Sequence, residues 1–326
     1  QGGGAVDSVH VRVTVAARGT LTSMVAMVLR SACSSRTWSA SALVKRKLVQ
    51  FLAAFLTNGN LPGFLQGRIW QGASKAVCVP GLNCYSCPGA LGACPLGSLQ
   101  NTLAGTVLRF PAYALGLLVL FGAVLGRTVC GWLCPFGLVQ ELLYKIPVPK
   151  LGKNRITRRL TYLKYVVGLV FVLLLPVLFL TVNGTGAPAF CTYICPAGTL
   201  EAALPLLATH PELRAGLGGI FAVKVVILLV VVGSACFIYR PFCRFLCPLG
   251  AWYGIFNKFS CFGVKVDQQR CDHCGACARF CKLDVQVAGD RECICCGACR
   301  KVCPQKAISL GLVRSNPRVE EVKVCK

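Results

Sequence analysis

Histidine and acidic residues are scarce in this sequence, and each shortage excludes a class of protein. The 326 residues include only three histidines, His10, His210 and His273. None of them lies in a stretch predicted to cross a membrane, which excludes a membrane haem held between paired histidines. Aspartate and glutamate together number 11. No catalytic triad, acidic pair or glycine-rich nucleotide motif can be assigned, so the sequence favours a protein without a substrate site of its own.

Charged residues as a whole make up only 14% of the chain, whereas hydrophobic residues make up 55% and the mean hydropathy is +0.63. This composition is typical of a membrane protein. Three uncharged apolar stretches are near the length that crosses about 30 Å of hydrocarbon, namely 110–126, 165–182 and 225–239. The third becomes long enough if it starts near Leu217 and the Lys224 side chain reaches back to the membrane surface. A shorter stretch, 48–57, is interpreted as a fourth span or a half-embedded helix.

Basic residues then orient the predicted spans. Residues 127–159 carry seven Lys or Arg, residues 183–216 carry only Arg214, and residues 240–270 carry five. Because basic loops stay on the cytoplasmic side, the sequence predicts a multi-pass protein of a bacterial-type inner membrane with its C-terminal part in the cytoplasm. The segments 183–216 and 58–109 are then outside. We attribute the formal charge of +24 to this topology and to attraction toward anionic lipid, not to nucleic-acid binding.

Two cysteine runs near the C-terminus share the spacing C-x2-C-x2-C-x3-C, and Pro304 follows the second. This spacing is typical of two [4Fe-4S] clusters, in which three cysteines of a run bind one cluster and the fourth binds the other. The first predicted cluster uses Cys271, Cys274, Cys277 and Cys303. The second uses Cys293, Cys296, Cys299 and Cys281. Zinc is a weaker interpretation, since zinc sites close with four ligands and do not need two matched runs.

Two residues depart from the simplest form of this pattern. Lys282 stands where the first run would usually carry proline, which weakens that turn without removing a ligand. His273 lies inside the first run, but a Rieske-type site needs two histidines on one iron. We therefore expect His273 to be exposed or to lie outside the ligand set.

A Cys-Pro-x-Gly element occurs four times before these runs, beginning at Cys94, Cys134, Cys195 and Cys247. The last three copies have a cysteine four residues upstream, namely Cys130, Cys191 and Cys243. Proline favours the first position of a helix, so each preceding cysteine is predicted at the N-cap, where free N–H groups favour a metal thiolate. The alternative is that proline and glycine only break helices at the membrane surface while cysteine packs as a small hydrophobe.

The predicted topology sorts these cysteines onto two sides of the membrane. The inner set is Cys130, Cys134, Cys243 and Cys247. The outer set is Cys191 and Cys195 with some of Cys78, Cys84, Cys87 and Cys94. Either set could bind one further iron-sulfur cluster, although disulfides are a rival in the oxidising outer compartment. Five cysteines outside every set are predicted to be spare thiols: Cys33, Cys236, Cys261, Cys295 and Cys325.

The segments 129–135 and 240–248, together with the double cysteine run, resemble the membrane-bound polyferredoxins. That family includes the membrane quinol-oxidising component of periplasmic nitrate reductase systems and the membrane electron donor to nitrous oxide reductase. The resemblance implies cytoplasmic [4Fe-4S] clusters that pass electrons between a cytoplasmic or quinone donor and a membrane or extracytoplasmic acceptor. It also implies a redox protein partner, which in such systems often carries flavin. The extra cysteines at 78–94 and 191–195 depart from the family pattern.

The sequence thus predicts an all-α polytopic membrane bundle of about four spans with a C-terminal α+β two-cluster bacterial ferredoxin-like domain. The domains are an unassigned extension (1–44), a transmembrane domain (45–260), the ferredoxin-like domain (261–310) and a flexible tail (311–326). The expected function is electron transfer. The alternatives are a membrane thiol-disulfide oxidoreductase that acts through Cys191 and Cys195, and a redox-sensing assembly or regulatory factor.

Overall fold

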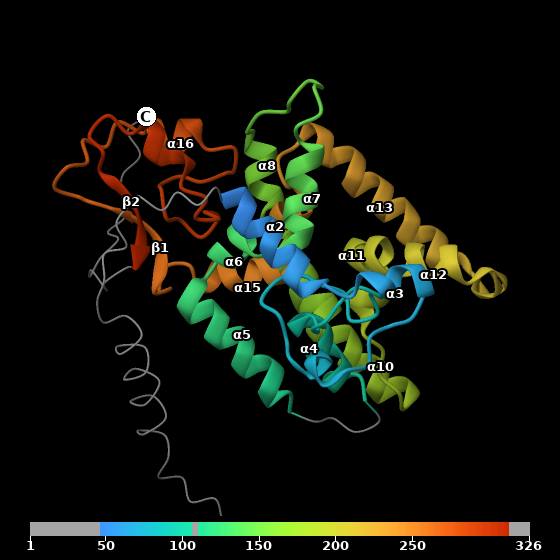
Figure 1. Ribbon diagram of the computed structural model, residues 1–326. Helices are drawn as coiled ribbons and strands as arrows, with labels where there is room; N and C mark the ends of the chain where they lie inside the picture. The colour runs from blue at the N-terminus through green and yellow to red at the C-terminus, as the bar shows by residue number, and fades with distance from the viewer. Residues whose placement is uncertain (1–45, 106–109, 313–326) are drawn as a thin grey trace, which may run out of the picture. The chain divides into compact units, whose positions relative to one another are not determined.

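The fold is given by a computed structural model that describes residues 46–105 and 110–312 (Figure 1). The extension 1–44, nearly all of the tail 311–326, and the predicted spare thiols Cys33 and Cys325 lie outside the described residues.

The described chain is mostly helical. Before residue 155 the α-helices are α2 Arg46–Thr57, α3 Leu61–Gln66, α4 Pro95–Leu103, α5 Ala112–Leu125, α6 Thr128–Trp132 and α7 Pro135–Leu143. After it they are α8 Arg155–Leu160, α9 Leu163–Val167, α10 Leu175–Asn183, α11 Pro196–Gly198, α12 Leu204–Thr209, α13 Gly219–Phe237, α14 Pro241–Phe245, α15 Pro248–Phe256 and α16 Ala276–Phe280. Short 3-10 or π segments join several of them, including η4 Phe190–Ile194, η5 Thr199–Ala203 and η7 Ala298–Val302.

Two helices are long and apolar enough to cross a membrane. The helix that runs from α8 to α10 covers Arg155–Asn183 with 29 residues, and α13 covers 19 residues. They contain the predicted spans at 165–182 and, for the most part, 225–239. The predicted span at 110–126 forms α5, whose 14 residues extend only about 21 Å. The stretch at 48–57 lies in the 12-residue α2. The prediction of four spans is therefore only partly matched.

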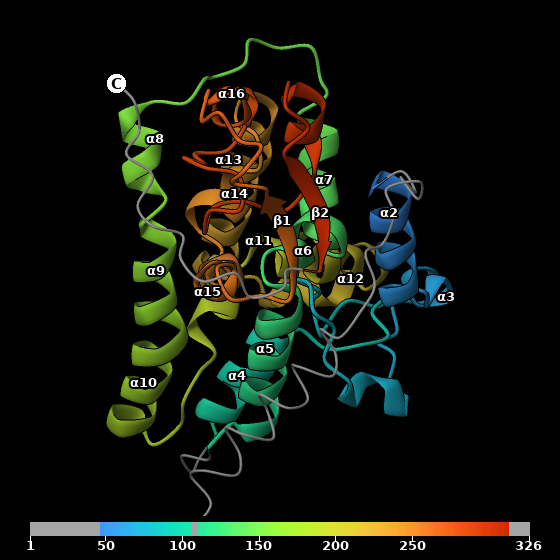
Figure 2. The same cartoon turned by 90° about the vertical axis from the view of Figure 1, so that its left-hand side faces the viewer.

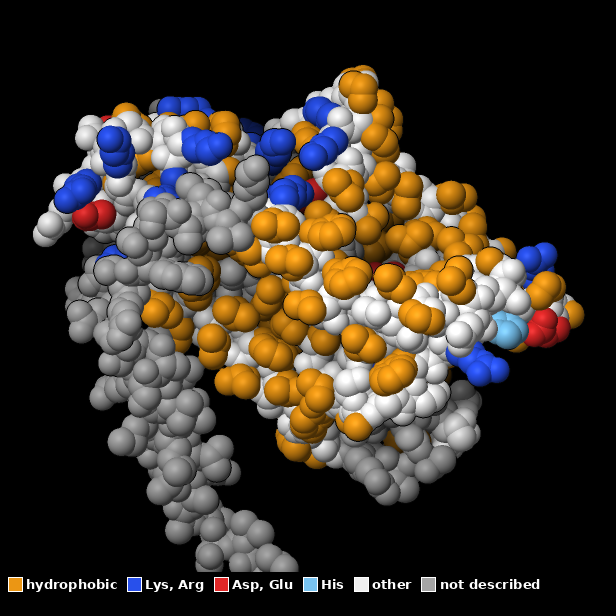
Figure 3. Space-filling view, viewed as in Figure 1, with side chains coloured by type: hydrophobic (Ala, Val, Ile, Leu, Met, Phe, Trp, Pro, Cys, Tyr) orange, Lys and Arg blue, Asp and Glu red, His pale blue; other side chains and the backbone are white. Residues whose placement is uncertain are grey.

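The surface of these helices is largely apolar. Val226, Leu229 and Val230 on α13 are exposed, as are Phe51 and Leu56 on α2. Figure 3 shows hydrophobic side chains over much of one face, with Lys and Arg gathered toward the C-terminal segment. A soluble monomer rarely exposes such a large apolar patch, and lipid contact would account for it.

The two C-terminal cysteine runs lie between strands β1 Phe262–Val266 and β2 Ile308–Leu312. These strands pair antiparallel, with Val264 opposite Leu310. Both views place this segment beside α6 and α7, whereas α4 lies toward the other end of the α8–α10 helix (Figures 1 and 2). The two runs also repeat one backbone conformation, because Gly275 and Gly297 have φ near +70°, a value that glycine adopts without strain.

Candidate metal centres

All four Cys-Pro-x-Gly elements start a helix in the way that the sequence predicts. Each proline is the first or second helical residue, and the cysteine before it is the N-cap residue. Cys94 precedes α4, Cys134 precedes α7, Cys195 precedes α11 and Cys247 precedes α15. The Gly198 N–H donates to Cys195 Sγ at 3.5 Å. The predicted N-cap geometry is confirmed, and it directs free backbone N–H groups toward the sulfur positions.

The structure brings the four cysteines of the inner set together. All four are buried in the main hydrophobic core. Burial first, and then Cys243 and Cys130, raise the pKa of Cys134 well above its usual range. The pKa of Cys247 is also raised by burial and by the neighbouring cysteines. The four thiols are therefore neighbours in the core, and a bound metal cluster would stabilise such buried sulfurs as thiolates.

Two buried guanidinium groups border the inner set. Arg127 and Arg240 are both nearly inaccessible. Arg240 Nη1 donates to the Cys130 carbonyl, and Arg127 Nη2 donates to the Cys243 carbonyl at 3.4 Å. The Nε atom of each arginine has no hydrogen-bond partner among the described residues. Arg240 shares the carboxylate of Glu141 with Arg46 and Lys47, and Arg127 shares that of Glu292 with Lys164. Because these cations outnumber their carboxylate partners, and buried cations need compensating negative charge, an anionic cluster of thiolates and iron fits this site.

Glutamine side chains support the two sets in the same way. Gln140 Oε1 accepts from the Phe242 amide at 3.1 Å, and Gln140 Nε2 donates to Cys243 Sγ at 3.1 Å. Gln100 Oε1 accepts from the Phe190 amide at 2.9 Å, and its Nε2 donates to Cys191 Sγ at 3.4 Å. Each glutamine follows the cysteine of its own Cys-Pro-x-Gly element by six residues, so the contact belongs to the repeat.

Four of the six cysteines in the outer set line a cavity of about 1110 Å³: Cys84, Cys94, Cys191 and Cys195. Burial raises the pKa of Cys84 to about 12. Burial, followed by Cys94 and Cys84, raises the pKa of Cys191 to about 12. The other two cysteines do not line this cavity. Cys78 forms an isolated β-bridge with Ala93, and Cys87 Sγ lies 3.8 Å from Asn58 Oδ1.

Five cysteines of the C-terminal runs line a smaller cavity of about 290 Å³, namely Cys277, Cys281, Cys293, Cys296 and Cys299. All four predicted ligands of the second cluster are among them. For the first predicted cluster, Cys277 reaches this cavity, whereas Cys271, Cys274 and Cys303 lie outside its lining. The structure therefore brings together one of the two predicted ligand sets more clearly than the other. His273 is exposed, as expected.

None of these groups has the geometry of a single-ion site. In residues 46–105 and 110–312, no three Cys, His, Asp or Glu side chains converge closely enough to hold one metal ion. A [4Fe-4S] cluster distributes its protein ligands over four irons, so its thiolates lie farther apart than those around zinc. No disulfide joins the cysteines of the same ranges.

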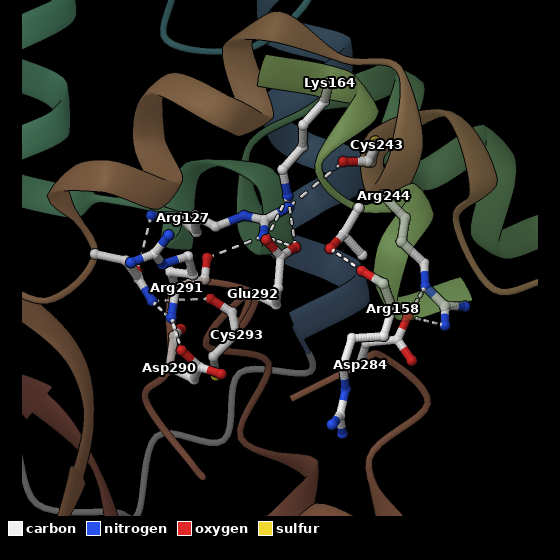
Figure 4. Close-up of polar contacts among 12 residues, drawn as sticks. Arg127, Arg158, Lys164, Cys243, Arg244, Asp284, Asp290, Arg291, Glu292 and Cys293 are labelled. Atoms are coloured by element: carbon white, nitrogen blue, oxygen red, sulfur yellow. Dashed lines mark hydrogen bonds and ion pairs between the residues drawn. The ribbon is translucent and has the colours of Figure 1, made fainter. Parts of the chain in front are cut away.

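Buried ion pairs attach the C-terminal segment to the helices (Figure 4). Glu292 accepts from Arg127 Nη1 at 2.6 Å and from Lys164 Nζ at 2.5 Å, and both cations reach it from the helical part. Arg244 forms a second buried pair with Asp284. Because Glu292 precedes Cys293 and Arg244 follows Cys243, both pairs lie directly beside candidate ligands.

Three further contacts complete this junction. Trp132 Nε1 donates to the Cys295 carbonyl at 2.9 Å. Gly131 packs so closely that a Cβ atom there would lie 2.1 Å from the Ile294 carbonyl oxygen. Lys282 Nζ lies 4.9 and 5.5 Å from the ring centres of Tyr144 and Tyr239. Lys282 thus packs against the helices instead of stiffening the turn, as proline would.

The remaining predicted spare thiols, Cys236, Cys261 and Cys295, do not line either cavity. Cys236 Sγ donates to the Val232 carbonyl at 3.6 Å, and Cys295 is fully buried beside Asn257. Cys261 is buried near the start of β1. The sequence predicts that the Lys224 side chain reaches back to the membrane surface. In the structure its Nζ donates to the Cys191 carbonyl at 3.3 Å.

Comparison with known proteins identifies the same cysteine elements. The family model described as "4Fe-4S binding domain" matches residues 108–154, 166–205 and 220–265, and each segment contains one C-x3-C-P element. The chain is a member of the membrane-associated 4Fe-4S ferredoxin-type family. The resemblance to this group is thereby confirmed, and the match covers cysteines of both the inner and the outer set.

Individual relatives extend over most of the chain. The uncharacterized protein MJ0750 of Methanocaldococcus jannaschii is 30% identical over 67% of this chain and 86% of its own length. The methylamine utilization ferredoxin-type protein MauN of Methylorubrum extorquens is 32% identical over 57% of this chain and 59% of its own length. The ferredoxin-type protein NapH of Haemophilus influenzae is 28% identical over 60% of this chain and 66% of its own length. No solved structure matches the chain.

Sequence reasoning gave no role to the polar residues around these centres. Gln100 and Gln140 occupy one position of the repeat, and that recurrence was a usable signal. Arg127 and Glu292 lie 165 positions apart, and nothing in their local sequence pairs them.

Proposed function

We propose that this protein transfers electrons through [4Fe-4S] clusters, two in the C-terminal segment and at least one held by the inner set. A bound cluster supplies one-electron oxidation and reduction. Cys281, Cys293, Cys296 and Cys299 would hold one C-terminal cluster, and Cys271, Cys274, Cys277 and Cys303 the other. Cys130, Cys134, Cys243 and Cys247 would hold the membrane cluster.

The observation that carries this function is the position of Arg127. Its guanidinium donates to the Cys243 carbonyl in the inner set and to the Arg291 carbonyl and the Glu292 carboxylate beside Cys293. One side chain thus joins the backbone beside one candidate centre to the backbone beside the other. Electron transfer requires centres that lie close together, and this contact holds their segments side by side. A thiol-disulfide oxidoreductase would need no contact of this kind.

Apolar helices and relatives support a membrane setting for this transfer. We propose a multi-pass protein of a bacterial-type inner membrane, with the C-terminal clusters on the cytoplasmic side, where basic segments gather. The donor would be a cytoplasmic redox protein, such as a flavin-carrying one, or a quinone in the lipid bilayer. The acceptor would lie in the membrane or beyond it. Relatives named as ferredoxin-type proteins, one of them for methylamine utilization, and one named for electron transport are consistent with this role.

Counting iron tests the proposed function. Protein purified without oxygen should contain about eight irons if only the C-terminal clusters form, and about twelve or more if the inner set also binds a cluster. Cys247→Ser should then remove about four irons and leave the C-terminal signals in electron paramagnetic resonance spectra unchanged. Cys236→Ser is the matched control and should keep all of the iron. An iron content of about eight in the unaltered protein would refute a cluster at the inner set.

A further inference from the structure

The outer set of cysteines has no role in the function proposed above. Four of its cysteines line one cavity, yet they come from two distant segments of the chain, 78–94 and 191–195. We propose that Cys84, Cys94, Cys191 and Cys195 bind an additional [4Fe-4S] cluster, whereas Cys78 and Cys87 are not ligands. This inference deepens the proposed electron transfer, because it names a second membrane centre and its ligands.

Two glycines open the space between these four sulfurs. A Cβ atom at Gly198 would lie 3.6 Å from Cys84 Sγ and 3.9 Å from Cys195 Sγ. A Cβ atom at Gly97 would lie 3.8 Å from Cys94 Cβ and 3.9 Å from Cys191 Sγ. Each glycine therefore faces one pair of the proposed ligands. Every residue larger than glycine would project a methyl or more into the space that a cluster would fill.

Without a cluster, a Cβ atom at Gly97 or Gly198 would not clash with any protein atom. Distances of 3.6 to 3.9 Å are ordinary van der Waals contacts between carbon and its neighbours. Packing against protein atoms alone thus does not require glycine at Gly97 or Gly198. In the inner set, by contrast, a Cβ atom at Gly137 or Gly250 would lie 3.1 Å from a backbone carbonyl oxygen, so packing alone explains those glycines.

The outer site also repeats the polar support of the inner site. Gln100 bridges the Phe190 amide and Cys191 Sγ as Gln140 bridges the Phe242 amide and Cys243 Sγ. At the outer site Glu201 accepts from the Cys84 amide at 3.1 Å. Hydrogen bonds of this kind hold the backbone around a cluster and adjust the charge on its sulfurs.

Positive charge borders the same cavity. Lys75 and Lys224 both line it. Lys75 Nζ donates to the Ala90 carbonyl at 2.7 Å, and Lys224 Nζ donates to the Cys191 carbonyl at 3.3 Å. Lys75 is almost fully buried, and a buried ammonium needs negative charge nearby. A cluster held by four thiolates supplies that charge.

Gly198→Ala and Gly97→Ala in the full-length protein test the inference. If a cluster occupies the site, each variant should lose about four irons relative to the unaltered protein while its melting temperature stays the same or rises, because alanine favours the helix. Gly116→Ala in α5 is the control, since a Cβ atom there meets nothing within 4 Å, and it should keep all of the iron. Unchanged iron in both site variants would overturn the assignment.

A second pair of variants tests the choice of ligands. Cys84→Ser should lose the same four irons, and Cys87→Ser should keep them. The opposite result would overturn the proposed ligand set. These outcomes are separate from the proposed function, because loss of iron in Cys247→Ser depends only on the inner set. About twelve irons in the unaltered protein with loss only in Cys247→Ser would refute the outer cluster and leave the proposed function standing.

Discussion

The inner and outer sets share one building plan but differ in their surroundings. Both combine C-x3-C-P elements at helix starts with a glutamine that contacts a sulfur. The inner set is enclosed by Arg127, Arg240 and the C-terminal segment, whereas the outer set faces a cavity of about 1110 Å³. The repeat therefore determines the position of each cysteine sulfur at a helix start. The flanking segments determine whether that sulfur is enclosed by protein or faces a cavity.

The largest expected effect concerns the junction between the inner set and the C-terminal segment. Arg127→Met removes a buried cation that contacts Glu292 and the Cys243 carbonyl. Since breaking a buried pair leaves a charge poorly compensated, we expect the free energy of unfolding to fall by roughly 3 kcal/mol, as measured by denaturation in detergent. Arg270→Met is the control, because its pair with Asp267 is exposed and its loss should change little. Equal stability of the two variants would contradict the structure of this junction.

A steric change at the same junction should have the next largest effect. Gly131→Ala places a Cβ atom 2.1 Å from the Ile294 carbonyl oxygen, so the backbone of the C-terminal segment must move. We expect a loss of about 1–3 kcal/mol and slower electron transfer between the C-terminal and inner centres, measured by rapid reduction. Gly233→Ala in α13, where a Cβ atom meets nothing within 4 Å, should leave both quantities unchanged.

The glutamine pair measures how similar the two sets are. Gln100→Leu and Gln140→Leu each leave one buried amide unbonded, that of Phe190 or Phe242, at a cost of about 1–3 kcal/mol. Each variant also removes an N–H donor from a sulfur, so the midpoint potential of the corresponding cluster should fall. Redox titration followed by electron paramagnetic resonance gives this shift. A shift of the potential in only one variant would show that the glutamine contact has different roles at the two sites.

The smallest expected effect concerns Lys282. Lys282→Met removes the cation above the Tyr144 and Tyr239 rings, and such a contact at an exposed site is worth about 0.5–1 kcal/mol. We expect a correspondingly small fall in melting temperature with no loss of iron. Iron loss in this variant would instead place Lys282 among the residues that keep the first cysteine run in its ligand geometry.

Local rules explain which parts of the site the sequence could predict. The N-cap position of Cys94, Cys134, Cys195 and Cys247 follows from the proline that comes next, and the structure confirms it at every copy. The two long apolar helices were also predictable from their composition. Both features depend on residues that are close together in the chain.

Features that depend on distant residues could not be predicted in this way. Six cysteines were candidates for the outer set, and only the packing of the 78–94 segment against η4 and α11 brings four of them to one cavity. The length of α5 also differs from the prediction, because the helix begins after Pro111 and ends at Leu125, before Gly126. Arg127 and Glu292 meet only when the C-terminal segment docks on the helices.

The close fit of Gly131 against Ile294 bears on how a redox partner would reach the C-terminal cysteine runs. Many small iron-sulfur carriers work as shuttles that swing or diffuse between partners. Here a backbone contact too tight for a methyl group holds the C-terminal segment, which carries the two cysteine runs, against the helices. Under the proposed function, a soluble redox partner would therefore have to bind at a C-terminal segment that does not swing, and mutations that loosen this contact should slow transfer between the C-terminal and inner centres.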